Sequence, residues 1–196
     1  MNTRFMLCCL LALPIVVVAD ANHGQFMGYE LGAEYPSPPQ EFEVTTAGDL
    51  LIEAENPTKP ADIAQVTLVA TPESRTIGYI SAVSWHATEE EAREVGRRYA
   101  ELLRAKYPNW KFGREVMDTR MHIVEVNLDN SPYNLQLRLV LEEHDGRDMW
   151  RFSMGLGWQR ETIERKTWQS KAAAEHVATR ATEHEKLMKE MDTRGL

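Results

Sequence analysis

The dipeptide Asp145-Gly146 constrains the fold of this chain more than any other feature of the sequence. Asp-Gly favours a tight two-residue β-hairpin turn, because the central positions of that turn need positive φ. With residue 144 opposite residue 147, five apolar pairs share one face: Leu141 with Trp150, Leu139 with Phe152, Leu137 with Met154, Leu135 with Leu156, and Tyr133 with Trp158. A slip of one residue would expose all of them, so the turn and the pattern predict the same register.

The other face of the predicted hairpin is polar. It carries Asn134, Gln136, Arg138, Glu142, Arg151 and Ser153. One apolar face and one polar face are typical of an antiparallel sheet in which one face packs on the core and the other faces solvent. We therefore expect the hairpin to form the centre of such a sheet.

Four further strands are predicted ahead of the hairpin. Apolar and polar residues alternate over 63–70 and 76–85, and again over 110–116 and 121–128. A period of two is typical of half-buried strands. The sheet core is expected to hold three tryptophans: Trp85, Trp150 and Trp158.

A helix is predicted to begin after Thr88. Glu91 follows three residues later, which is the spacing at which two side chains can satisfy each other's free backbone donors. The helix carries one apolar stripe, which must pack on the sheet: Ala92, Val95, Tyr99, Leu102 and Leu103. Pro108 disfavours helical backbone at the preceding residue, so the helix is expected to end near Lys106.

The chain from residue 159 onward predicts a second, long helix. It is rich in charged residues and contains neither Gly nor Pro before Gly195. Its apolar residues follow a three-four spacing, with His184 in the same row: Ala174, Val177, Ala181, Met188 and Met191. Such a row makes a narrow seam along one side of the helix.

Residues 1–21 have the features of an export signal. Arg4 precedes an apolar run over residues 5–18, and Ala19-Asp20-Ala21 offers a cleavage site. A membrane-spanning helix needs about 20 apolar residues, and this run is shorter, so we expect cleavage rather than a membrane anchor. The expected location is the periplasm or the cell exterior. Both cysteines leave with the signal, so stability must come from a packed core.

The complete pattern divides the chain into four parts. A signal peptide (1–21) is followed by an extended, proline-rich lead-in (22–60), a core domain (61–158) and a C-terminal helix (159–196). Any strand in the lead-in, for example over 41–45, should be short or at an edge, because proline cannot donate to a sheet. The order of elements predicts an α+β, two-layer sandwich: an antiparallel sheet of about six strands, in the order ββαββββ, with one central helix and a long C-terminal helix.

The charge of the chain excludes some partners. The formal net charge is −8, and no basic stripe is visible. Nucleic acid and anionic lipid are both recognised by clustered Lys and Arg, so neither is expected as a partner. The six histidines show no metal-ligand spacing, and no phosphate-binding loop is present, so no metal or cofactor is predicted.

Two groups of residues suggest acid–base or nucleophilic chemistry. His144 lies among Glu142, Glu143 and Asp145, but a hairpin tip is wet and offers no walled pocket. Ser84 and His86 are close in sequence, but no G-x-S-x-G motif surrounds them. We therefore assign no catalytic residue. A small envelope hydrolase, with a histidine and carboxylates that meet only in the fold, is the alternative.

Four residues are candidates for a binding surface: Trp110, Trp168, His144 and Asp145. The two tryptophans lie where strand or helix ends expose side chains, and exposed tryptophans favour binding. Trp168 has a second interpretation, in which it only fastens the terminal helix to the sheet. The sequence as a whole is interpreted as an exported, non-enzymatic interaction protein with a protein partner in the cell envelope. An inhibitor or an immunity protein is one concrete form of that function.

Overall fold

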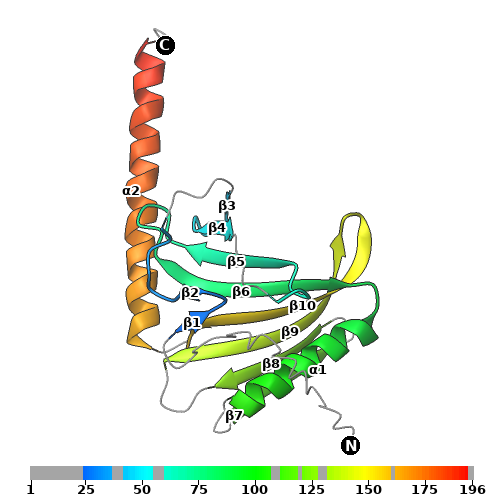
Figure 1. Ribbon diagram of the computed structural model, residues 1–196. Coiled ribbons are helices and arrows are strands. Elements are labelled where there is room, and N and C mark those ends of the chain that lie inside the picture. The colour runs from blue at the N-terminus through cyan, green and yellow to red at the C-terminus, as the bar shows by residue number, and fades with distance from the viewer. Residues whose placement is uncertain are drawn as a thin grey trace, which may run out of the picture.

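The computed structural model describes residues 24–36, 42–54, 60–106, 111–118, 121–127, 132–159 and 162–193 (Figure 1). The predicted signal peptide (1–21) and Trp110 lie outside these ranges. The described elements, in chain order, are β1 (Gln25–Phe26), β2 (Tyr29–Glu30), β3 (Phe42–Val44), β4 (Leu50–Glu53), β5 (Gln65–Ala70), β6 (Ile77–His86), α1 (Glu89–Lys106), β7 (Lys111–Asp118), β8 (Met121–Asn127), β9 (Tyr133–His144), β10 (Arg147–Trp158) and α2 (Ile163–Thr193).

The predicted α+β architecture is confirmed. An eight-stranded antiparallel sheet has the order β3-β4-β5-β6-β10-β9-β8-β7. The strands from β5 to β10 are the predicted ones, in the predicted order around α1. The short strands β3 and β4 extend the sheet beyond β5, and β3 lies at the edge, as expected for a strand over 41–45.

The β9–β10 hairpin has the register that the turn and the pattern predict. His144 is opposite Arg147, Leu139 is opposite Phe152, and Tyr133 is opposite Trp158. Asp145 and Gly146 have φ values of 52° and 73°, which the tight turn requires. On its other side β10 pairs with β6, so the hairpin lies in the middle of the sheet.

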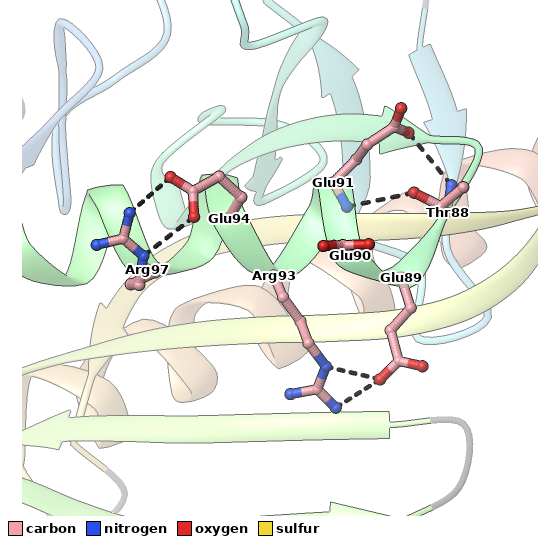
Figure 2. A pocket seen from close by; sticks show the side chains of 7 residues that line it. All are labelled: Thr88, Glu89, Glu90, Glu91, Arg93, Glu94 and Arg97. Carbon is pink, nitrogen blue, oxygen red and sulfur yellow. Dashed lines mark hydrogen bonds and ion pairs between the residues drawn. The ribbon is translucent and has the colours of Figure 1, made fainter.

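One face of the sheet, here called the core face, is covered by α1, the β1–β2 hairpin and the beginning of α2 (Figure 1). The buried residues of β9 and β10 on this face are Leu135, Leu137, Leu139, Phe152, Met154 and Leu156. Helix α1 begins with the expected reciprocal cap, since the Glu91 N–H donates to Thr88 Oγ1 and the Thr88 N–H donates to Glu91 Oε2, both at 3.3 Å (Figure 2).

The buried side of α1 differs from the predicted stripe at two positions, Leu102 and Gly96. Leu102 is 53% exposed, whereas Ala92, Tyr99 and Leu103 are buried. Gly96 takes a place on the buried side, where a Cβ would lie 3.3 Å from Phe152 Cε2. The ring of Tyr99 stacks on that of Phe152, with centroids 5.8 Å apart. A glycine gives no hydrophobic signal, so the sequence pattern could not show that it faces the sheet.

The segment 22–60, expected to be an extended lead-in, contributes to the core where the structure describes it. Leu31 and Leu50 are buried, and Phe26 and Ile52 are fully buried. These residues belong to the same core cluster as Phe152. The apolar pieces between the prolines are too short to show a period, so the sequence did not reveal that they pack.

The sheet face opposite the core face is here called the outer face. Trp85 was expected in the core, but it lies on this outer face. Trp85 pairs with Arg151, and Tyr79 pairs with Gly157, both on the outer face. The ring of Tyr79 lies across the neighbouring strand, because a Cβ at Gly155 would come within 1.7 Å of Tyr79 Oη. The glycines of β10 are therefore explained by the close approach of a tyrosine side chain.

Candidate functional site

A single tryptophan fastens the beginning of α2 to the sheet. The Trp168 indole Nε1–H donates a hydrogen bond to the Thr76 carbonyl oxygen at 2.9 Å. The indole lies on Gly78, where a Cβ would come within 2.2 Å of the ring. It also contacts the ring of Trp158, with centroids 6.2 Å apart. Glycine at position 78 is thus what allows α2 to approach the sheet here.

The carboxylate of Glu175 binds the turn between β5 and β6. Its Oε2 accepts hydrogen bonds from the backbone N–H groups of Glu73 at 2.9 Å and Ser74 at 3.0 Å. Its Oε1 accepts a third from Ser74 Oγ at 2.6 Å. Burial raises the pKa of this carboxyl, but the donors on Ser74 and Glu73 outweigh it and hold the pKa below its ordinary value.

The contacts of α2 with the rest of the protein follow one side of the helix. We call this side the anchoring stripe: Trp168, Ala172, Glu175 and Thr179. Spacings of four, three and four residues put these side chains in one row. Next to the row, His176 Nε2 lies 3.0 Å from Asp49 Oδ1 and ties α2 to the β3–β4 turn as well.

The second half of α2 extends beyond the sheet (Figure 1). Every side chain from residue 180 to residue 190 is exposed. Val177 is 69% exposed and Met188 is 53% exposed. These two residues belong to the seam of α2, which we define as Ala174, Val177, Ala181, His184, Met188 and Met191. From Ala174 to Met188 the helix therefore presents a mainly apolar row that its own fold leaves in solvent.

Comparison with known proteins does not name a relative. No family profile, curated protein or solved structure gives a significant match to this chain. The chemistry of its own residues therefore has to carry the functional argument.

The structure does not bring the predicted binding residues together. Trp168 lies at the Trp158 end of β10, whereas His144 and Asp145 form the hairpin tip at the opposite end of the same strand. Trp168 is half-buried and acts as a fastener. Asp145 is 89% exposed in its side chain, and Trp110 lies outside the described residues.

His144 is held by packing on the outer face. Its ring stacks on Trp85, with centroids 4.0 Å apart and an interplanar angle of 5°. The Arg151 guanidinium carbon lies 5.9 Å from the Trp85 ring centroid, and Arg151 pairs with Glu142 at 2.9 Å. This is a stack whose charges are balanced, and it explains His144 without a ligand.

Ser84 and His86 do meet in the fold. Ser84 Oγ and His86 Nε2 are 2.9 Å apart, and burial lowers the pKa of His86 more than Glu91 and Asp62 raise it. However, Ser84 is only 2% exposed, so a substrate cannot reach its hydroxyl. The Asp62 carboxylate accepts hydrogen bonds from Tyr99 Oη at 2.8 Å and from Arg98. The Asp62 carboxylate therefore binds Tyr99 and Arg98 and does not complete a catalytic triad with Ser84 and His86.

A shallow depression follows the first turns of α1 (Figure 2). Its acidic side chains are largely bound to neighbours on the same helix. Arg93 pairs with Glu89, and Arg97 pairs with Glu94, each at 2.6 Å. These are exposed ion pairs of the kind that stabilise a helix surface. The depression has no buried polar group that would define a ligand.

The part of the chain that the structure describes contains neither a metal-binding cluster nor a membrane-spanning helix. No three His, Cys, Asp or Glu side chains there are grouped to hold a metal ion. Neither α1 nor α2 has an apolar stretch long enough to cross a lipid bilayer.

Three residues that matter for the position of α2 were missed by sequence reasoning: Glu175, His176 and Asp49. Glu175 and Ser74 are 101 residues apart in the chain, so no local pattern links them. A polar residue on the inner side of an amphipathic helix is the only signal, and many solvated residues give the same signal.

The contribution of Glu175 is expected to depend on pH. Because its folded pKa is below the ordinary value of 4.5, its stabilisation is present at neutral pH and is lost as the pH falls through the folded pKa. We expect Glu175→Gln to lower the free energy of unfolding by about 1 kcal/mol at neutral pH, after allowance for solvent screening. The difference should shrink as the pH falls below 4.5 in a series of urea titrations. Glu183→Gln, on the exposed side of α2, is the control, and a gap that stays constant with pH would contradict the assignment.

Proposed function

We propose that this protein is an exported, non-enzymatic interaction protein that binds a protein partner in the cell envelope through the seam of α2. One observation carries the proposal. A helix anchored by Trp168 and Glu175 continues beyond the sheet with Val177 and Met188 exposed. An exposed apolar row on a preformed helix is suited to binding a helix or a groove, because little ordering is left to oppose the association.

Capture from envelope extract tests the proposal. The bait is the intact protein, compared with Val177→Glu and Met188→Glu, which put a charge into the seam. Thr182→Glu adds the same charge on another side of the exposed half of α2 and is the matched control. We expect the two seam variants to lose a defined partner that the wild type and Thr182→Glu retain. Equal capture by all four proteins would contradict the proposal.

Export is tested separately, because the proposed compartment depends on residues 1–21. We expect the protein recovered from the periplasm or the medium to have the mass of a chain that begins at Asn22. A full-length chain confined to the cytosol would contradict this part of the proposal.

A small envelope hydrolase is the second candidate, and the hydrogen bond between Ser84 and His86 is the observation that favours it. The burial of Ser84 opposes it, since a nucleophile must touch its substrate. A fluorophosphonate probe decides between the two. We expect no labelling of the wild type, and labelling that Ser84→Ala abolishes would establish the hydrolase instead.

A further inference from the structure

We infer that the partner on the seam of α2 is the seam of a second copy of this chain, in a parallel two-helix coiled coil. This inference rests on the proposed function, because it names the occupant of the same surface. Four observations carry it: the heptad spacing, the direction in which the seam points, the charges beside it, and the charge balance of the exposed half of α2.

The seam has the spacing of a coiled coil. Its residues alternate steps of three and four from Ala174 to Met191, which places them at the a and d positions of successive heptads. Ile163 lies on the same row and is 78% exposed. Two short stretches of this kind are weak when each helix must first form. Here the first half of α2 is already folded against the sheet, so the cost of nucleating the helix is absent.

The seam points away from the body of its own protein. Each of four seam residues follows a residue of the anchoring stripe by nine positions: Val177 follows Trp168, Ala181 follows Ala172, His184 follows Glu175, and Met188 follows Thr179. Nine residues are about two and a half turns, so the two rows lie on opposite sides of the helix. Two copies can therefore join seam to seam with their sheets on the outside, and the sheets do not collide.

The charges beside the seam suit a parallel pair. With Ala181 and Met188 at a positions, Arg180 occupies a g position and Glu185 occupies the e position of the next heptad. In a parallel coiled coil, g of one helix faces that following e of the other, so two Arg180–Glu185 pairs would form across the dimer. In an antiparallel pair g faces g, and this complementarity is lost. Within one chain Glu185 pairs with Lys189, and both side chains are exposed, so that pair opposes the exchange only weakly.

The balance of charge favours a copy of the same chain over a strongly basic partner. The whole chain has a formal charge of −8, but residues 177–193 hold four acidic and three basic residues. Nearly balanced charge on the exposed helix allows two copies to approach there, while the acidic surface of the bodies stays apart. A basic ligand would instead be drawn to surfaces elsewhere on the molecule.

Sedimentation of the purified protein over a range of concentrations tests the inference. We expect a reversible monomer–dimer equilibrium. Val177→Glu should weaken it by at least about tenfold, and Thr182→Glu should leave it unchanged. A protein that stays monomeric into the hundreds of micromolar, or a dimer that Val177→Glu does not weaken, would overturn the inference.

A charge exchange tests the parallel orientation. Arg180→Glu alone and Glu185→Arg alone should each weaken the dimer by about tenfold, because each places like charges across the seam. The double variant should recover most of the affinity, because the exchanged charges at positions 180 and 185 again attract each other across the dimer. Residues five apart on one helix do not face each other, so the exchange creates no new pair between these two positions within one chain. Far-UV circular dichroism checks that α2 stays helical in each variant. A double variant as weak as the single ones would rule out the parallel pair.

The two proposals fail in different ways. A monomeric protein that still captures a different protein through the seam overturns the second copy and leaves the proposed function standing. A seam that neither dimerises nor captures a protein overturns both.

Discussion

Trp168→Ala is expected to lower the free energy of unfolding by about 3 kcal/mol and to detach α2 from the sheet. The substitution removes the indole from Gly78 and Trp158 and leaves the Thr76 carbonyl oxygen without the indole donor. A large aromatic side chain lost from a packed site leaves a cavity that the fixed backbone cannot close. Urea unfolding gives the stability, and limited proteolysis of α2 shows the detachment.

Two variants separate the contributions of Trp168. Trp168→Phe keeps a ring but removes the N–H donor, so it should cost about 1 kcal/mol plus any loss of fit. Gln169→Ala, at an exposed position one residue along the same helix, should change stability by less than about 0.5 kcal/mol. If Trp168→Ala behaved like Gln169→Ala, Trp168 would not be the fastener of α2.

Phe152→Ala is expected to be at least as damaging, with a loss of about 3–5 kcal/mol. Phe152 is 2% exposed, its ring stacks on that of Tyr99, and it lies against Gly96 on the same helix, α1. It is therefore a main contact between the central hairpin and the central helix. The loss should appear as a lower urea midpoint with an unchanged slope.

The chain supplies a matched control for this substitution. Phe42 is 52% exposed on the edge strand β3, so Phe42→Ala removes the same atoms from a wetter site. We expect it to cost less than about 1 kcal/mol. Comparable losses for the two variants would show that the core is not centred on the hairpin face.

The register of the hairpin could be predicted because two independent features agree. Asp145-Gly146 limits the turn, and the alternation of leucines and aromatics limits the strand faces, so only one pairing satisfies both. Helix α1 was predictable because each of its ends is fixed by residues next to it, the cap at Thr88 and the proline at 108.

The errors come from residues whose environment is set by distant parts of the chain. Trp85 has the apolar character of a core residue, but its position on the strand turns it to the outer face. There its ring contacts His144 and Arg151. Gly96 gives no apolar signal and yet faces Phe152. Local patterns report hydrophobicity and period, but not which neighbour will arrive from another strand.

The proposed binding surface was predictable only in part. The three-four spacing of the seam is visible in the sequence, but its exposure is not. That exposure depends on which residue of α2 makes the last contact with the sheet. The contacts of Trp168 and Glu175 with the β5–β6 turn determine this. Tryptophan content suggested Trp168 as a binding residue, whereas the indole is used to hold α2 in place.

A photo-cross-linking amino acid placed on α2 tests the central claim most directly, namely that the seam is where this protein binds protein. Position 188 lies on the seam, and position 186, which is also exposed, lies on another side of the helix. We predict that irradiation of the purified protein gives a covalent dimer from position 188 and little from position 186. No product from position 188, in the purified protein or in cells, or equal products from both positions, would contradict the account.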